Sequence, residues 1–132
     1  MSQENVEAVR RAYDAGYAER SVEKVLDAVD GSFVWHQRAE WPGRPLYRIE
    51  DMPELWADLD DTYIEFSLVP ADFAPFGEYV VVTVRLSARM RASDARIEAT
   101  HYHVWHFRDG KANEAWNYST RAEALEAVGL RE

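Results

Sequence analysis

The sequence YVVVTVRLSARMR, residues 79–91, alternates between apolar and polar side chains at nearly every step. Its even positions from Val80 to Met90 are all apolar, whereas most odd positions are Thr, Ser or Arg. A period of two is typical of a strand that buries one face. Residues 79–91 are therefore predicted to form a strand at the centre of a sheet.

The same period continues on both sides of this stretch. Residues 64–68 alternate in the same way, and Pro70 indicates a bulge or bend. Residues 96–108 and 111–118 predict two more strands. They are joined by Asp109-Gly110, a dipeptide typical of two-residue hairpin turns. The second half of the chain is thus predicted to be an antiparallel sheet.

The first half has helical spacing instead. Apolar side chains recur three or four residues apart from Val6 to Tyr17, and Ser21 is a suitable N-cap for a second helix that ends at Asp30-Gly31. Residues 32–37 predict a short strand, and the Pro- and Gly-containing residues 38–48 predict a loop.

Two capping-box patterns predict further helices. Asp51 with Glu54 introduces a third helix, and Thr120 with Glu123 introduces a short C-terminal helix. The order predicts one α+β domain over residues 1–132, in which three helices of the N-terminal half close one face of a curved antiparallel sheet. The 132 residues, 47% of them hydrophobic, are enough for one such core.

Composition narrows the classes of partner. The formal net charge is −9, and a surface of that sign repels nucleic acid and anionic lipid, so we expect neither nucleic acid nor membrane as a partner. The chain has no cysteine, which excludes disulfides and thiolate chemistry. The N-terminus shows no signal-peptide pattern, and we expect a cytoplasmic protein.

The hairpin turn sets the register of the polar side chains. A two-residue turn at Asp109-Gly110 predicts His103 opposite Trp116 and His101 opposite Tyr118, all on the apolar, inward face. Glu114 falls on that face too, diagonal to His103. A buried carboxylate and imidazole in reach of each other suit proton transfer, but a purely structural hydrogen bond explains them equally well. His36, on the first strand, is a third candidate for this cavity.

The predicted catalytic residues are therefore His103, Glu114 and His36. Aromatic and imidazole side chains at the predicted cavity are the candidates for substrate binding: Tyr13, Tyr17, Trp41, Trp56, His101, Trp105, Trp116 and Tyr118. Core packing alone accounts for many of these rings. A minority reading is a metal site in which His101 and His103 are completed by Glu114 or His36. We assign no metal and no organic cofactor.

Several motifs resemble one family. Val34-Trp35-His36, Glu40-Trp41-Pro42-Gly43, His103-Val104-Trp105 and Arg108-Asp109-Gly110-Lys111, with the ending 121–127, are similar to the SnoaL-like branch of the nuclear transport factor 2-like superfamily. The resemblance implies a cone-shaped sheet with an internal pocket, and homodimers that pack through the outer sheet face. Polyketide cyclases and ketosteroid isomerases are relatives. The positions of the isomerase acids are occupied here by His36 and His103.

The resemblance and the residues together predict a pocket for an apolar small-molecule ligand. The first hypothesis is an isomerase, cyclase or lyase that moves protons through His103 and Glu114 on a carbonyl-bearing compound. The alternative is a non-catalytic ligand-binding or dimerisation module, since the isomerase acids are missing and the predicted lining is largely aromatic.

Overall fold

The structure, a computed structural model, describes residues 2–38, 40–41 and 43–129. In chain order its elements are α1 (Ser2–Tyr13), the π-helical turn η1 (Asp14–Ala18), α2 (Val22–Ala28), β1 (Val29–His36), β2 (Leu46–Arg48), the 3-10 turn η2 (Ile49–Asp51), α3 (Met52–Thr62), β3 (Tyr63–Phe76), β4 (Tyr79–Met90), β5 (Arg96–Arg108), β6 (Lys111–Tyr118) and α4 (Arg121–Ala127). Among the described residues, no helix has the length and apolar character to cross a membrane.

The predicted α+β class is confirmed, with one correction to the sheet. Its six strands follow the order β2-β1-β6-β5-β4-β3. All neighbours are antiparallel except β1 and β6, which run parallel. The prediction of a wholly antiparallel sheet is wrong at this pair, because the chain passes through β2, α3 and the strands β3 to β5 before β6 returns beside β1.

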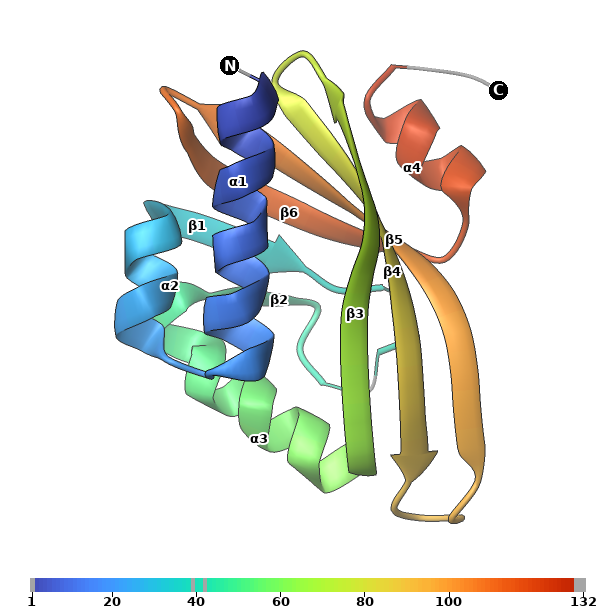
Figure 1. Cartoon of the computed structure of the whole chain (residues 1–132). Coiled ribbons are helices and arrows are strands. Elements are labelled where there is room, and N and C mark those ends of the chain that lie inside the picture. Colours follow the sequence, from blue (N-terminus) through green and yellow to red (C-terminus); the bar gives the residue numbers. More distant parts are fainter. Residues whose placement is uncertain (1, 39, 42, 130–132) are drawn as a thin grey trace.

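The helices divide between the two faces of the curved sheet (Figure 1). α1, α2 and α3 pack on the inner face, where Val80, Val82 and Val84 are fully buried. The short α4 covers part of the outer face through Ala124, which packs with Val81 and Val104. The homodimer expected through the outer face stays a prediction, and α4 restricts it to the uncovered part of that face.

Most of the local signals are confirmed. The Ser21 side chain accepts a hydrogen bond from the backbone of Lys24 at 3.2 Å, and Thr120 with Glu123 forms a complete capping box. Asp109 and Gly110 both have positive φ, 53° and 80°, as a type I′ hairpin turn requires. β3 is bulged directly after Pro70, where the register shifts.

The predicted loop and third capping box need correction. Residues 46–48 form the edge strand β2, which pairs with β1. Asp51 does not cap α3 with its side chain; its carboxylate accepts the backbone N–H of Arg48 at 3.0 Å. Glu54 forms an ion pair with Arg44 instead of completing the box. Asp51 therefore stabilises the turn η2, which precedes the helix.

The β4–β5 register differs from the prediction by two residues. The sequence predicts Val84 opposite His103. In the structure Val82 lies there instead, because residues 91–95 all belong to the turn. A shift of two residues leaves each side chain on the same face of the sheet. His101 and His103 consequently face inward, as predicted.

The β5–β6 register is as predicted only beside the turn. Phe107 pairs with Ala112, but the next pair is His106 with Glu114, so Asn113 is the extra residue of a β-bulge. Beyond a one-residue bulge every side chain changes face. The bulge therefore directs outward three residues that were predicted to face inward: Glu114, Trp116 and Tyr118.

Candidate functional site

His103 lies at the centre of the inner face and is completely buried. Its Nδ1 is 2.6 Å from the hydroxyl of Tyr13, and the indole N–H of Trp105 donates to the same hydroxyl at 3.1 Å. An indole nitrogen can only donate, so the Tyr13 hydroxyl keeps its own hydrogen for His103. This arrangement makes Nδ1 the acceptor and places the ring hydrogen of His103 on Nε2.

The other side of the imidazole is unpaired. His103 Nε2 and the indole nitrogen of Trp35 are both buried, and neither has a hydrogen-bond partner among the described residues. The edge of one ring faces the plane of the other, with centroids 4.7 Å apart. A buried donor without a partner costs about 1–3 kcal/mol. Two unpaired donors on neighbouring rings are suited to ligand oxygens.

Burial also sets the charge of His103. Desolvation, helped by the nearby His101 and Arg38, lowers the pKa of His103 from 6.5 to about 3. The ring is therefore neutral at physiological pH. It can donate a hydrogen bond from Nε2, but it is a poor acceptor of protons.

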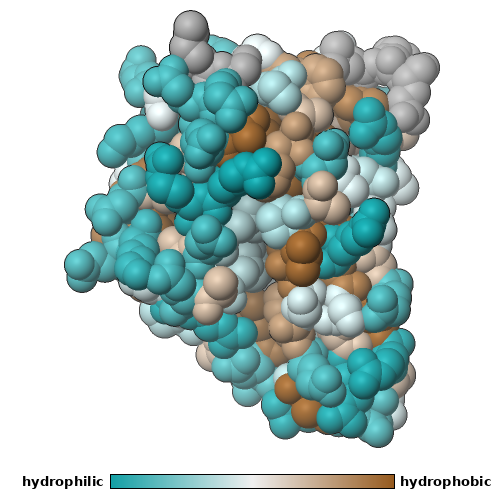
Figure 2. Space-filling view, viewed as in Figure 1, coloured by the Kyte–Doolittle hydropathy of each residue, from teal (hydrophilic) through white to brown (hydrophobic). Residues whose placement is uncertain are grey.

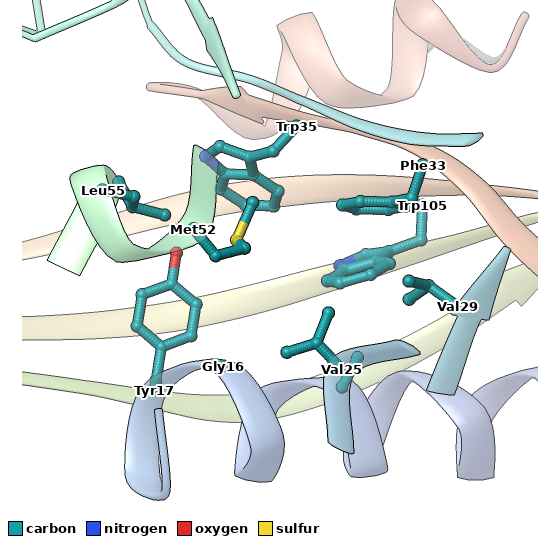
Figure 3. A pocket seen from close by; sticks show the side chains of 10 residues that line it. Gly16, Tyr17, Val25, Val29, Phe33, Trp35, Met52, Leu55 and Trp105 are labelled. Atoms are coloured by element: carbon teal, nitrogen blue, oxygen red, sulfur yellow. The ribbon is translucent and has the colours of Figure 1, made fainter. Parts of the chain in front are cut away.

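An almost wholly apolar space, the inner cavity, lies between α1, η1, α2, β1 and α3 (Figure 3). Its volume is about 30 Å³, enough for about two water molecules. In Figure 3 the hydroxyl of Tyr17 points toward Met52 and Trp35. The lining residues are Ala12, Gly16, Tyr17, Val25, Val29, Phe33, Trp35, Met52, Leu55 and Trp105.

A second space of about 30 Å³, the polar cavity, lies on the other side of Tyr17. Apolar side chains of α3, β3 and β4 form one wall, and the opposite wall contains Gln37, Arg38, His101 and Asn117. Burial and the Arg38 guanidinium lower the pKa of His101, so this imidazole is neutral at physiological pH as well.

Tyr17 is a wall of both cavities and also of a surface groove. This front groove, of about 240 Å³, runs between the end of α1 and β3, and is lined by Tyr13, Tyr17, Phe66 and Leu68 among others. Figure 2 shows apolar surface gathered over β3, next to the hydrophilic surface of α1. Tyr17 belongs to the π-helical turn η1, a local widening of a helix that is frequent at functional sites.

Trp41 closes the polar cavity from the loop after β1. Its indole N–H donates to the Tyr47 hydroxyl at 2.8 Å, and that hydroxyl donates to Asp58 at 2.7 Å. Gly43 permits this contact, because a Cβ there would lie 2.3 Å from the Tyr47 oxygen. Pro42 lies outside the described residues.

The carboxylate–imidazole pair exists, but on the outer face and with a different histidine. His36 Nε2 is 2.7 Å from Glu114, and the His36 ring stacks on Trp116 at a centroid distance of 5.2 Å. An outer hollow of about 220 Å³ beside α4 is lined by His36, Trp116 and Tyr118, and also by Arg38. The pairing of His103 with Glu114, and the placement of His36 inside the cone, are therefore wrong.

Two further predictions change accordingly. Trp56, which was predicted to bind substrate, stabilises η1 instead, since its indole N–H donates to the Gly16 carbonyl at 2.6 Å.

The prediction of a metal site is wrong, because His36 and Glu114 lie on the face opposite His101 and His103. Within the described part of the chain, no three His, Asp or Glu side chains are grouped closely enough to hold a metal ion.

Sequence reasoning missed the polar wall of Gln37, Arg38 and Asn117. Arg38 comes directly after a strand whose apolar side chains are inward, and before a loop that folds back over the cavity. A charged residue at such a junction is the signal that could have identified it.

The fold and the closed interior define a class, the α+β cone proteins with an internal pocket. The model of the SnoaL-like domain matches residues 9–115, and the chain belongs to this family, within the nuclear transport factor 2-like superfamily. No curated protein sequence matches the chain.

Solved structures share the fold. A nuclear transport factor 2-like protein from Burkholderia xenovorans is 21% identical, with a TM-score of 0.77 over 96% of this chain and 97% of that one. A putative SnoaL-like polyketide cyclase from Jannaschia is 19% identical, with a TM-score of 0.73 over 97% and 90%. A Catenulispora acidiphila protein with a ketosteroid isomerase-like fold, in complex with trimethylamine, is 11% identical, with a TM-score of 0.69 over 94% and 93%.

Proposed function

We propose that the chain binds an apolar, carbonyl-bearing small molecule inside the cone and promotes proton transfer on it, as an isomerase, cyclase or lyase without an organic cofactor. The observation that carries this proposal is the state of His103. It is fully buried, its Nδ1 is occupied by Tyr13, and its Nε2 is an unpaired donor, as is the indole nitrogen of the neighbouring Trp35 ring.

The roles of the histidines follow from their environments. His103 donates from Nε2 to the carbonyl oxygen and stabilises the negative charge that develops there. His101, neutral and half-buried, removes the proton from the carbon next to the carbonyl; the C–H electrons become those of the enolate, and the imidazolium returns the proton. Glu114 has no part in this step, because the bulge at Asn113 directs it outward.

Ligand entry requires movement of Tyr17. The two cavities are each far below the roughly 300 Å³ of a typical ligand pocket. Tyr17 separates them from each other and from the front groove, so rotation of this one side chain joins all three spaces. Its neighbours Tyr13 and Phe66 are in stacking contact on its two sides.

A generic ketone tests the proposal without knowledge of the natural substrate. Acetonaphthone in heavy water should bind, and its methyl protons should exchange for deuterium faster with the protein than in buffer, as followed by proton NMR. Exchange at the buffer rate in spite of binding would remove proton transfer from the proposal.

The alternative is a ligand-binding module without turnover. It is favoured by the small volume of the cavities and by the low pKa of His103, about 3, which suits a hydrogen-bond donor better than a proton carrier. Bound ketone without exchange is the result that this alternative expects.

A further inference from the structure

Arg38 has an unusual position for an arginine of an acidic protein. It lies just after β1, its side chain is only 20% exposed, and it forms part of the wall of the polar cavity. Its Nη1 pairs with Glu40 at 3.0 Å, on the exposed side. Its Nε is buried and has no partner among the described residues.

A guanidinium cannot lose its charge to avoid this situation. A buried N–H edge that lacks an acceptor therefore carries the cost of desolvation. Glu40 satisfies only the outer edge, because its carboxylate is 65% exposed and lies on the solvent side. The inner edge therefore has charge and hydrogen-bonding capacity to offer to a ligand.

The neighbours of Arg38 leave this edge free. Asn117 donates to Gln37 at 3.1 Å, and the Asn117 Oδ1 is buried without a partner among the described residues, so it does not accept from the guanidinium. The positive charge of Arg38 reaches both inward histidines, since it contributes to lowering the pKa of His101 and of His103. Arg38 and His101 line the same polar cavity, and His103 lies two positions from His101 on the same face of β5.

We propose that Arg38 binds an anionic oxygen of the ligand, so that the ligand is an apolar acid whose carbonyl lies toward His103. This inference rests on the proposed function and adds the substrate class to it. A charge-assisted hydrogen bond to a guanidinium is among the stronger polar contacts in proteins. It would also orient the ligand, with the acid at the polar cavity and the apolar body toward the inner cavity.

Two probes of the same shape separate the acid from the ketone. Naphthoate carries a carboxylate where acetonaphthone carries a methyl ketone on the same ring. Both are titrated into the wild-type chain, Arg38→Gln, Arg38→Lys and Arg96→Gln, with tryptophan fluorescence and calorimetry as readouts. Arg96 is the matched control, because it is an exposed arginine at the far end of β5.

The expected result is a selective loss. Arg38→Gln should weaken naphthoate binding at least about tenfold and leave acetonaphthone binding unchanged, since a hydrogen bond to a charged group is lost for one probe only. Arg38→Lys keeps the charge and should retain a preference for naphthoate, which decides the question if the Gln variant does not fold. Arg96→Gln should change neither affinity.

The other outcomes are distinct. The acidic-ligand inference is overturned if Arg38→Gln weakens the binding of both probes equally, or if it does not weaken naphthoate binding. In either case the proposed function still stands as long as acetonaphthone binds. Failure of the wild-type chain to bind either probe overturns both.

Discussion

His103 and His36 lie on opposite faces of the same sheet and differ in almost every property. His103 is fully buried and bonded to a hydroxyl, whereas the side chain of His36 is 30% exposed and bonded to a carboxylate that is 36% exposed. Water reaches the ring of His36. It does not reach His103, so the interior retains a neutral ring with one unpaired N–H, which suits it to polarise a ligand oxygen.

The largest difference between the two faces should appear in proton exchange. His103→Leu removes the interior donor and should lower the exchange of acetonaphthone protons about 100-fold, the usual cost of losing one donor to a developing oxyanion. Glu114→Gln, on the outer face, should leave the rate unchanged. NMR exchange rates measure both. If Glu114→Gln lowered the exchange rate as much as His103→Leu, the outer carboxylate would take part in the mechanism.

The faces should also differ in the pH dependence of stability. The pKa of His103 is about 3 in the folded chain, whereas an unfolded imidazole titrates near 6.5. Between these values only the unfolded state binds the proton, so the free energy of unfolding falls as the pH is lowered, by up to about 1.4 kcal/mol per pH unit. This contribution is fully present above about pH 6.5.

Urea unfolding of the wild type and His103→Gln at neutral and mildly acidic pH measures this contribution. The variant lacks the titrating ring, so its loss of stability on acidification should be clearly smaller. Parallel pH profiles for the two chains would show that the ring of His103 is not held neutral by the fold.

The smallest effect is expected for the outer pair. Because His36 and Glu114 are each about one-third exposed, His36→Gln should cost less than about 1 kcal/mol at neutral pH, as for other solvent-screened pairs. A urea titration of His36→Gln, Glu114→Gln and the double variant gives the coupling between them. A coupling well above that figure would mean that the outer hollow is more closed to water than the exposures indicate.

The sequence was sufficient for the architecture because its signals are redundant. The alternation of residues 79–91, the Asp109-Gly110 turn and the Ser21 cap each depend on local chemistry, and each is present in the structure. Even the two-residue error in the β4–β5 register had no consequence for the faces, since the side-chain period of a strand is two.

The candidate site was less predictable because one residue decides it. The bulge at Asn113 moved Glu114, Trp116 and Tyr118 to the outer face, and the turn signal next to it contains no information about a bulge. One clue was present: Ala112 and Ala115 are apolar residues three positions apart, a spacing that puts them on opposite faces of a regular strand, whereas the structure buries both in the same core. The neighbouring Trp116 concealed it, since apolar side chains occupy both faces here.

The state of the His103 ring is most directly tested by proton–nitrogen correlation NMR of the free chain, assigned with His103→Gln. The account predicts a hydrogen on Nε2, none on Nδ1, and signals that do not change between neutral pH and about pH 5, because the ring titrates far below its usual range. A hydrogen on Nδ1, or a ring that becomes doubly protonated in that interval, would contradict it.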